Sequence, residues 1–171
     1  MANDPLWRLP EVPGFTLQSS DFEDGSALPT TARDDSGGVS PELHWSGAPE
    51  ATQSYVLTVY DPDAPTGSGF WHWAVRNIPS TTTELPAGAG TDGTLPDGAI
   101  TSANEMRAET FAGAAPPAGH GAHRYFFTLS ALDIPTVDIP DGATPAVLGF
   151  FMRDHVIARA TLVGTAETPA E

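Results

Sequence analysis

Glycine and proline interrupt this chain so often that long helices have little room to form. The 171 residues include 17 glycines and 17 prolines, together about one fifth of the sequence. Proline cannot continue a helix interior or a central strand, and glycine favours turns. This pattern predicts short elements joined by many turns. With 40% hydrophobic residues, a chain of this length can still bury one core.

Several segments alternate apolar and polar residues or are rich in β-branched and aromatic ones, as is typical of strands. Only one segment has helical spacing. There, Thr144 is expected to cap the helix and Pro145 to occupy its first position. The predicted strands are 15–20, 43–46, 54–60, 70–78, 123–132 and 160–164, and the predicted helix is 145–158.

Strands outnumber helices and the helix comes late. This order favours a mainly β fold, an antiparallel β-sandwich with a few peripheral helices, one of them near the C-terminus. We expect a single domain over 15–164, an extended arm over 1–14 with three prolines, and a flexible tail over 165–171.

The charge balance excludes several classes of partner. The chain has 22 acidic and 7 basic residues, a net charge of −15. A protein this acidic repels nucleic acid and anionic lipid headgroups, so we expect no nucleic-acid binding and no stable membrane association. The N-terminus has no basic stretch followed by an apolar one, and no segment reaches the ~20 apolar residues of a membrane span. We therefore expect a cytoplasmic protein.

Three segments combine titratable side chains with a proline-stiffened or aromatic backbone. They are Asp61-Pro-Asp-Ala-Pro65, Trp71-His-Trp73, and the loop and strand from Pro116 to Tyr125, which contains His120 and His123. Prolines fix φ and lower the entropic cost of holding a shaped site. One carboxylate and two imidazoles brought together could bind an anion, exchange protons or hold a metal.

Each of these residues also has a purely structural interpretation. Asp61 could cap the turn that follows its strand. His72 could be a packing residue, because a period of two places it on the strand face opposite Trp71 and Trp73. Arg124 could form a structural ion pair, and His120 lies among glycines where we expect exposure.

Read together and in this order, the three segments resemble the phosphatidylethanolamine-binding (Raf kinase inhibitor-like) protein family. Ser40-Pro-Glu-Leu-His-Trp45, Ser46-Gly-Ala-Pro49, Asn77-Ile-Pro79 and Leu148-Gly-Phe-Phe resemble its bacterial branch. The resemblance extends from about Phe15 to Gly164. It implies a β-sandwich with a small cavity that binds anions such as phosphate, acetate-like groups or phosphorylated headgroups.

The resemblance assigns roles by matching motif positions. It places Asp61 at the pocket floor, His72, His123 and Tyr125 around the ligand, and Pro65, Trp71 and Pro117 in the wall. It also makes Ala64–Pro65 a candidate cis peptide bond. Asp61 would repel a fully ionised ligand, so we expect it to orient or charge a histidine that then donates to the ligand.

These residues are compatible with three functions. The first is a binding module for a small anionic or phosphorylated ligand that regulates a protein partner such as a kinase or protease. The second is a cofactor-independent enzyme using Asp61, His72 and His123 for proton transfer, cyclisation or hydrolysis, although no activated nucleophile is evident. The third is a metal site with His120 added to that set, for which the spacing is a weak signal. We predict the first function, a ligand-binding module, with no metal and no cofactor. Bacterial members of the family are often homodimers, so the resemblance also suggests a homodimer.

Overall fold

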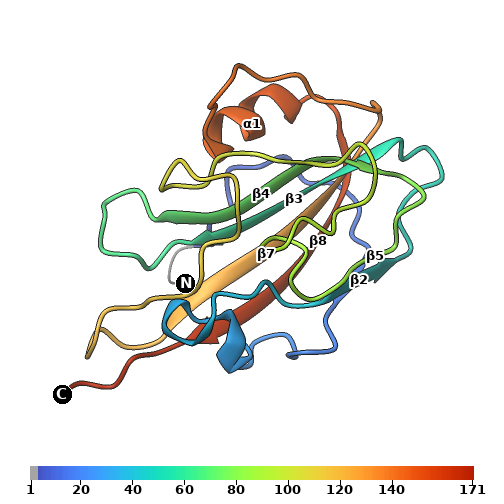
Figure 1. Cartoon of the computed structure of the whole chain (residues 1–171). Helices are drawn as coiled ribbons and strands as arrows, with labels where there is room; N and C mark the ends of the chain where they lie inside the picture. Colours follow the sequence, from blue (N-terminus) through green and yellow to red (C-terminus); the bar gives the residue numbers. More distant parts are fainter. Residues whose placement is uncertain (1–3) are drawn as a thin grey trace.

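Two antiparallel sheets form the frame of the protein. The computed structural model describes residues 4–171. The larger sheet has five strands in the order β6-β4-β3-β7-β8, and the smaller has three in the order β1-β2-β5 (Figure 1). The strands are β1 Thr16–Gln18, β2 Leu43–Ser46, β3 Ser54–Asp61, β4 Phe70–Pro79, β5 Glu84–Leu85, β6 Ile100–Thr101, β7 His123–Leu132 and β8 Val156–Ala166. The predicted antiparallel β-sandwich is confirmed.

The two faces of the large sheet are covered differently. Its inner face packs against the small sheet, and the main core between them includes Leu57, Trp73 and Phe127, all fully buried. Its outer face carries a smaller core in which Leu148 of α1 (Pro145–Met152) meets Val56 and other apolar side chains. In Figure 1, α1 lies on one side of this sheet, and β2 and β5 lie on the other.

Helix α1 begins as predicted but ends early. Thr144 Oγ1 accepts a hydrogen bond from the Val147 amide at 3.3 Å, and Pro145 is the first helical residue. The prediction of a helix to residue 158 was wrong, because the chain turns after Met152 and enters β8 at Val156. Pairing with β7 along most of its length outweighs the helical spacing of a few apolar residues.

The segments expected to form an extended arm and a flexible tail both make contacts with the rest of the fold. Residues 1–3 of the expected arm lie outside the described residues. Residues 5–8 form turns, and Gly14 makes an isolated bridge to Arg159. The expected tail boundary falls inside β8, and Gly119 donates its amide hydrogen to the Thr168 carbonyl at 2.9 Å.

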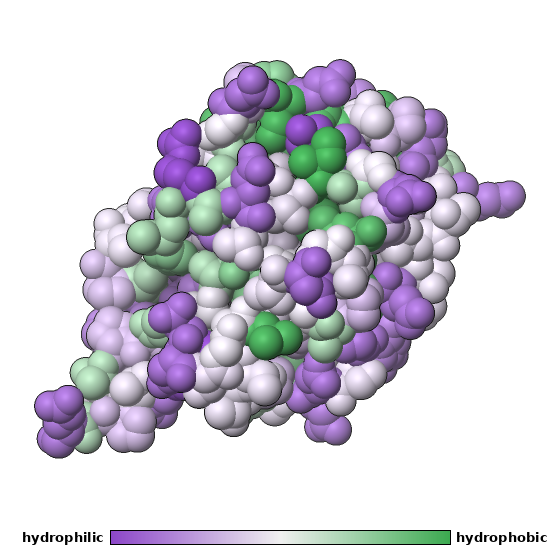
Figure 2. All heavy atoms as spheres, in the orientation of Figure 1, coloured by the Kyte–Doolittle hydropathy of each residue, from purple (hydrophilic) through white to green (hydrophobic). Residues whose placement is uncertain are grey.

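Within residues 4–171, no helix is both long and apolar enough to cross a bilayer. Figure 2 shows a mostly hydrophilic or neutral surface on one face, with hydrophobic atoms gathered where α1 and its neighbouring loops lie.

Candidate functional site

A pocket forms where three strand ends meet at one edge of the large sheet. Because β3 runs antiparallel to β4 and β7, its last residue, Asp61, pairs with Phe70 at the start of β4 and lies close enough to the start of β7 for its side chain to reach His123. This pocket, called here the Asp61 pocket, has a volume of about 360 Å³. It is lined by Asp34, Asp61, Ala64, Pro65, Thr66, Phe70, His72, Met106, Ala112, Gly113, Ala115, Pro117, His123 and Tyr125.

Asp61 and two histidines form a continuous hydrogen-bonded chain. Asp61 Oδ2 lies 2.7 Å from His123 Nδ1, and His123 Nε2 lies 2.7 Å from His120 Nδ1. Asp61 and His123 are both buried, whereas His120 is exposed. With a carboxylate at one end, the neutral arrangement has His123 Nδ1–H donating to Asp61 and His120 Nδ1–H donating to His123. Both nitrogens of His123 are therefore engaged inside the protein.

The hydrogen bonds of Asp61 define its role more closely than the sequence did. Its Oδ1 also accepts a hydrogen bond from the Asp63 amide at 2.8 Å, so Asp61 caps its turn as well as orienting His123. The structural interpretation of Asp61 is confirmed, and the same side chain also contacts His123. His123, in contrast, offers no free ring nitrogen to a ligand unless His120 moves away.

His72 faces the pocket because a β-bulge interrupts β4. Tyr60 pairs with Trp71 and Val59 pairs with Trp73, so His72 is an extra residue without a partner on β3. The expectation that His72 lies opposite both tryptophans was wrong. Trp71 faces the outer side of the sheet, while Trp73 joins the main core and His72 lines the pocket on the inner side.

The environment of His72 fixes its tautomer. The Ala112 carbonyl accepts a hydrogen bond from His72 Nδ1 at 2.8 Å. Burial lowers the pKa of His72 from its usual 6.5, although the bond to Ala112 and the charge of Asp61 act in the opposite direction. The neutral ring then has an unprotonated Nε2, which becomes a donor only when the imidazole takes up a second proton.

Tyr125 supplies a hydroxyl with no competing partner. Its ring lies edge-on to His72, with centroids 5.1 Å apart. Burial and the nearby Asp61 raise the pKa of Tyr125, so its hydroxyl stays protonated at physiological pH. This hydroxyl lines the pocket and takes part in no hydrogen bond with residues 4–171. It is therefore free to donate to a ligand oxygen.

A second carboxylate in the pocket was not predicted from the sequence. Asp34 belongs to the 3-10 helix η2 (Asp34–Ser36), and its charge acts on the pKa of His72. It lies far from the three motif segments in sequence, and only tertiary packing brings it there. Glycine at position 113 allows Asp34 to come this close, since a Cβ at Gly113 would stand 2.6 Å from the Asp34 backbone nitrogen.

The remaining predicted residues divide into two groups. Pro65 and Pro117 line the Asp61 pocket, but Trp71 does not and instead lines a groove on the outer face of the sheet. The Ala64–Pro65 bond is trans, so the expectation of a cis bond was wrong. Among residues 4–171, no three His, Asp or Glu side chains are arranged to hold a metal ion.

An ion pair outside the pocket fixes the first motif against β7. Arg124 donates to both carboxylate oxygens of Asp63, from Nε and from Nη2, each at 2.8 Å, and its backbone amide donates to the same carboxylate at 3.0 Å. The structural interpretation of Arg124 is confirmed. The guanidinium lowers the pKa of Asp63, so this carboxylate stays ionised near neutral pH.

Comparison with known proteins gives a consistent result. Residues 18–167 match the family model described as phosphatidylethanolamine-binding protein. The chain is 43% identical over 152 residues to the protein YbhB of Escherichia coli K12, covering 85% of this chain and 96% of that protein. It resembles the crystal structure of Escherichia coli YbcL, described as a new member of the mammalian PEBP family, with a TM-score of 0.85 and 42% identity over 90% of this chain and 98% of that chain. The crystal structure of a phosphatidylethanolamine-binding protein homologue from Chlamydia trachomatis superposes with a TM-score of 0.80 at 31% identity, covering 91% of this chain and 98% of that one.

Proposed function

The chain belongs to the phosphatidylethanolamine-binding protein family, and from that premise we propose that it binds a small anion or phosphorylated monoester in the Asp61 pocket. The observation that carries the proposal is the free Tyr125 hydroxyl beside His72, in a cavity also lined by Asp61 and His123, which are bonded to each other. The Tyr125 hydroxyl is a free donor, and His72 becomes a second donor when its imidazole takes up a proton.

The neutral form of His72 favours ligands that carry a proton of their own. A neutral His72 presents an acceptor at Nε2, which suits the P–OH of a monoprotonated phosphate. At lower pH the imidazolium donates instead and adds a positive charge. Affinity for phosphate should therefore fall as pH rises, whichever of the two forms binds.

Two carboxylates limit how much negative charge the pocket tolerates. Asp34 and Asp61 both line it, within a protein of net charge −15. A dianion would be repelled more strongly than a monoanion. This balance supports a phosphomonoester with a nearby ammonium, such as phosphoethanolamine, over inorganic phosphate.

The test compares two tyrosine variants by isothermal titration with phosphoethanolamine. Tyr125→Phe removes the free hydroxyl and should weaken binding at least tenfold, because hydrogen bonds to charged groups contribute about 1.5–3 kcal/mol. Tyr60→Phe is the matched control, since its hydroxyl donates to the Ser68 carbonyl at 2.8 Å outside this pocket. Equal affinities for wild type and Tyr125→Phe would contradict the proposal.

A second candidate, acid–base catalysis, is favoured by one observation. The Asp61–His123–His120 chain gives a route by which a proton can pass from the exposed His120 to a buried carboxylate. A cofactor-independent reaction on a small bound metabolite would use that route. Turnover that is lost in His120→Ala while ligand affinity is kept would favour the enzyme; ligand binding without turnover favours the binding module.

Regulation of a kinase or protease partner is the cellular consequence that we propose for ligand binding. Occupancy would be read out at the pocket rim, where Met106 is 70% exposed. We also propose that the protein acts in the cytoplasm.

A further inference from the structure

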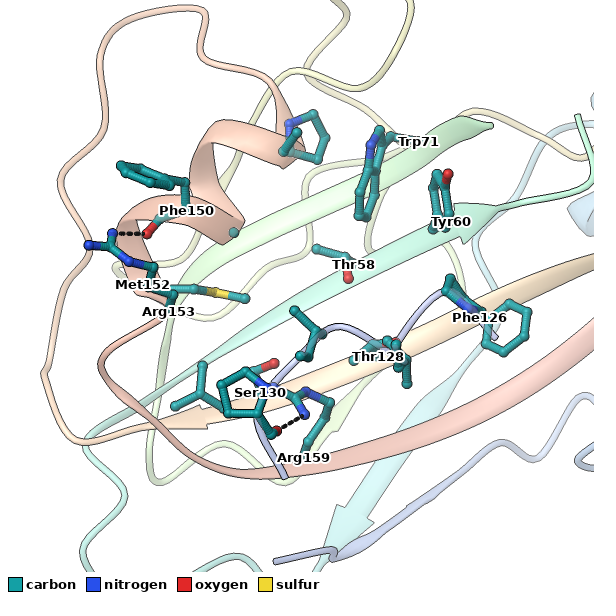
Figure 3. Close-up of a pocket in the computed structure, with 18 residues that line it drawn as sticks. Thr58, Tyr60, Trp71, Phe126, Thr128, Ser130, Phe150, Met152, Arg153 and Arg159 are labelled. Carbon is teal, nitrogen blue, oxygen red and sulfur yellow. Dashed lines mark hydrogen bonds between the residues drawn. The ribbon is translucent and has the colours of Figure 1, made fainter. Parts of the chain in front are cut away.

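A second cavity lies on the outer face of the large sheet, away from the Asp61 pocket. It is a groove of about 440 Å³ whose floor is formed by β3, β4, β7 and β8 and whose walls are α1 and residues 5–10 (Figure 3). We call it the outer groove. Adjacent residues of β7 show the separation: Tyr125 lines the Asp61 pocket, whereas Phe126 lines the outer groove. A volume of this size suits a small organic ligand.

The floor of the outer groove changes character along the strands. At one end Tyr60 pairs with both Trp71 and Phe126, which forms an aromatic row. In the next row Thr58 pairs with Thr128, and beyond it Ser130 pairs with Arg159. The groove is thus aromatic at one end and has a hydroxyl and a guanidinium at the other.

Arg159 is a cation without an anionic partner in the structure. Its Nη1 donates to the Pro10 carbonyl at 3.2 Å, its Nε is buried without a hydrogen-bond partner, and no carboxylate of residues 4–171 lies within 4.0 Å. This is unusual in a chain with 22 acidic and 7 basic residues. Burial lowers the pKa of Arg159, which reflects the cost of holding this charge away from water.

Uncommitted hydroxyls lie next to this cation. Thr58, Thr128 and Ser130 line the groove, and none of their side chains takes part in a hydrogen bond with residues 4–171. Figure 3 shows Ser130 and Arg159 side by side on the floor, with Thr128 and Thr58 following toward the aromatic end. A ligand that supplies an acceptor here would satisfy groups that the protein leaves unpaired.

We propose that the outer groove binds a small amphipathic carboxylate, with its apolar body over Tyr60 and Trp71 and its carboxylate at Ser130 and Arg159. Charge complementarity carries the choice of an anion, and the apolar walls carry the choice of an alkyl or aromatic body. A neutral apolar ligand would leave the guanidinium uncompensated. Inorganic phosphate would leave the aromatic row uncovered.

The experiment measures binding of decanoate, below its micellar concentration, by isothermal titration to the full chain. Arg159→Met removes the charge and should weaken decanoate binding at least tenfold. Arg107→Met is the control for the loss of one positive charge, because that guanidinium bonds the Gly142 carbonyl at 2.7 Å and does not line the groove. It should change the affinity less than twofold. Decanol, which has the same chain without the charge, should bind wild type at least tenfold more weakly.

A second variant fills the groove without touching Arg159. Gly149 lies within α1 and lines the groove, and a Cβ built there meets no atom within 4 Å. Gly149→Leu should therefore fold normally, with an unchanged or higher Tm, and lose decanoate binding at least tenfold. Its affinity for phosphoethanolamine should stay within twofold of wild type.

Three outcomes would overturn the proposal. Equal losses in Arg159→Met and Arg107→Met would show that no specific contact exists at Arg159. Competition between phosphoethanolamine and decanoate, with Gly149→Leu binding both normally, would place decanoate in the Asp61 pocket. A dimer by sedimentation that Gly149→Leu dissociates, together with no decanoate binding, would assign the groove to a second copy of the chain.

Discussion

At the scale of single residues, the Asp61 pocket depends on how its hydrogen bonds are already committed. His123 uses both ring nitrogens within the protein, His72 uses one, and Tyr125 uses none of its hydroxyl. A residue named by a motif can therefore have its polar atoms already engaged within the protein. In the proposed site, Tyr125 and His72 would contact the ligand, and Asp61 and His123 would support them.

The pKa of His72 predicts a specific dependence of stability on pH. Burial lowers this pKa below 6.5 in the folded protein, so the unfolded chain takes up the proton first as pH falls. The contribution of His72 is complete above pH about 6.5 and declines as pH falls toward the folded pKa. The free energy of unfolding in urea should therefore fall between pH 7.5 and pH 5, and His72→Asn, whose amide can still donate to Ala112, should reduce the fall. Identical pH profiles for the two proteins would rule out this role.

The charge of Asp34 predicts a selective effect on dianions. Asp34→Asn should tighten binding of inorganic phosphate by about threefold at pH 7.5, because it removes one repulsive charge from the pocket. Asp35→Asn is the control, since it makes the same change of net charge at a neighbouring residue that does not line the pocket. Titration calorimetry that gives the same gain for both variants would attribute the effect to net charge alone.

At the scale of elements, strand ends and one bulge place the functional groups. The antiparallel order of β4, β3 and β7 brings three sequence-distant segments to one edge, and the bulge at His72 turns this side chain inward. The bidentate Asp63–Arg124 pair then fixes the turn after β3 against β7. The pocket is thus built on strand ends, with loops completing its wall.

The N-cap of α1 gives a prediction for this element. Thr144→Ala should lower the free energy of unfolding by about 1 kcal/mol, because Oγ1 no longer satisfies the Val147 amide. Thr81→Ala, at an exposed threonine whose side chain makes no hydrogen bond with residues 4–171, should change it by less than about 0.5 kcal/mol. Chemical denaturation measures both, and equal losses would mean that the cap does not stabilise α1.

At the scale of the whole molecule, the large sheet separates two chemically different cavities. Its inner face packs against the small sheet and neighbouring loops and has the Asp61 pocket at one end, while its outer face carries the outer groove under α1 and residues 5–10. Neighbouring residues of a single strand therefore serve different sites. The two proposed ligands would therefore bind without overlap.

Two adjacent phenylalanines test this division. Phe127 is fully buried against Phe22, with ring centroids 5.3 Å apart, so Phe127→Ala should cost about 3–5 kcal/mol of stability. Phe126 faces the outer groove and is half-buried, so Phe126→Ala should cost about 1 kcal/mol. Urea denaturation of both variants gives the comparison, and a larger loss for Phe126→Ala would contradict the assignment of inner and outer faces.

Local sequence was sufficient for four strands and for the start of the helix, but it did not predict β5 or β6 and gave only part of β8. Alternation and β-branched content predicted the segments that became β2, β3, β4 and β7, and Thr144-Pro145 marked the start of α1, because these signals act between residues close together in the chain. The motifs also named Asp61, His72, His123 and Tyr125, which the fold gathers in one pocket.

Tertiary structure alone decided the rest. The bulge that separates Trp71 from His72, the entry of Asp34 into the pocket, and the bond between Asp61 and His123 all depend on partners distant in sequence. The helix ended at Met152 because β8 gained more from pairing with β7 than from continued helical spacing. The physical reason is the same in each case. The pairing of a strand and the hydrogen-bond partners of a side chain depend on residues that are close in space but distant in sequence, so a local sequence pattern does not determine them.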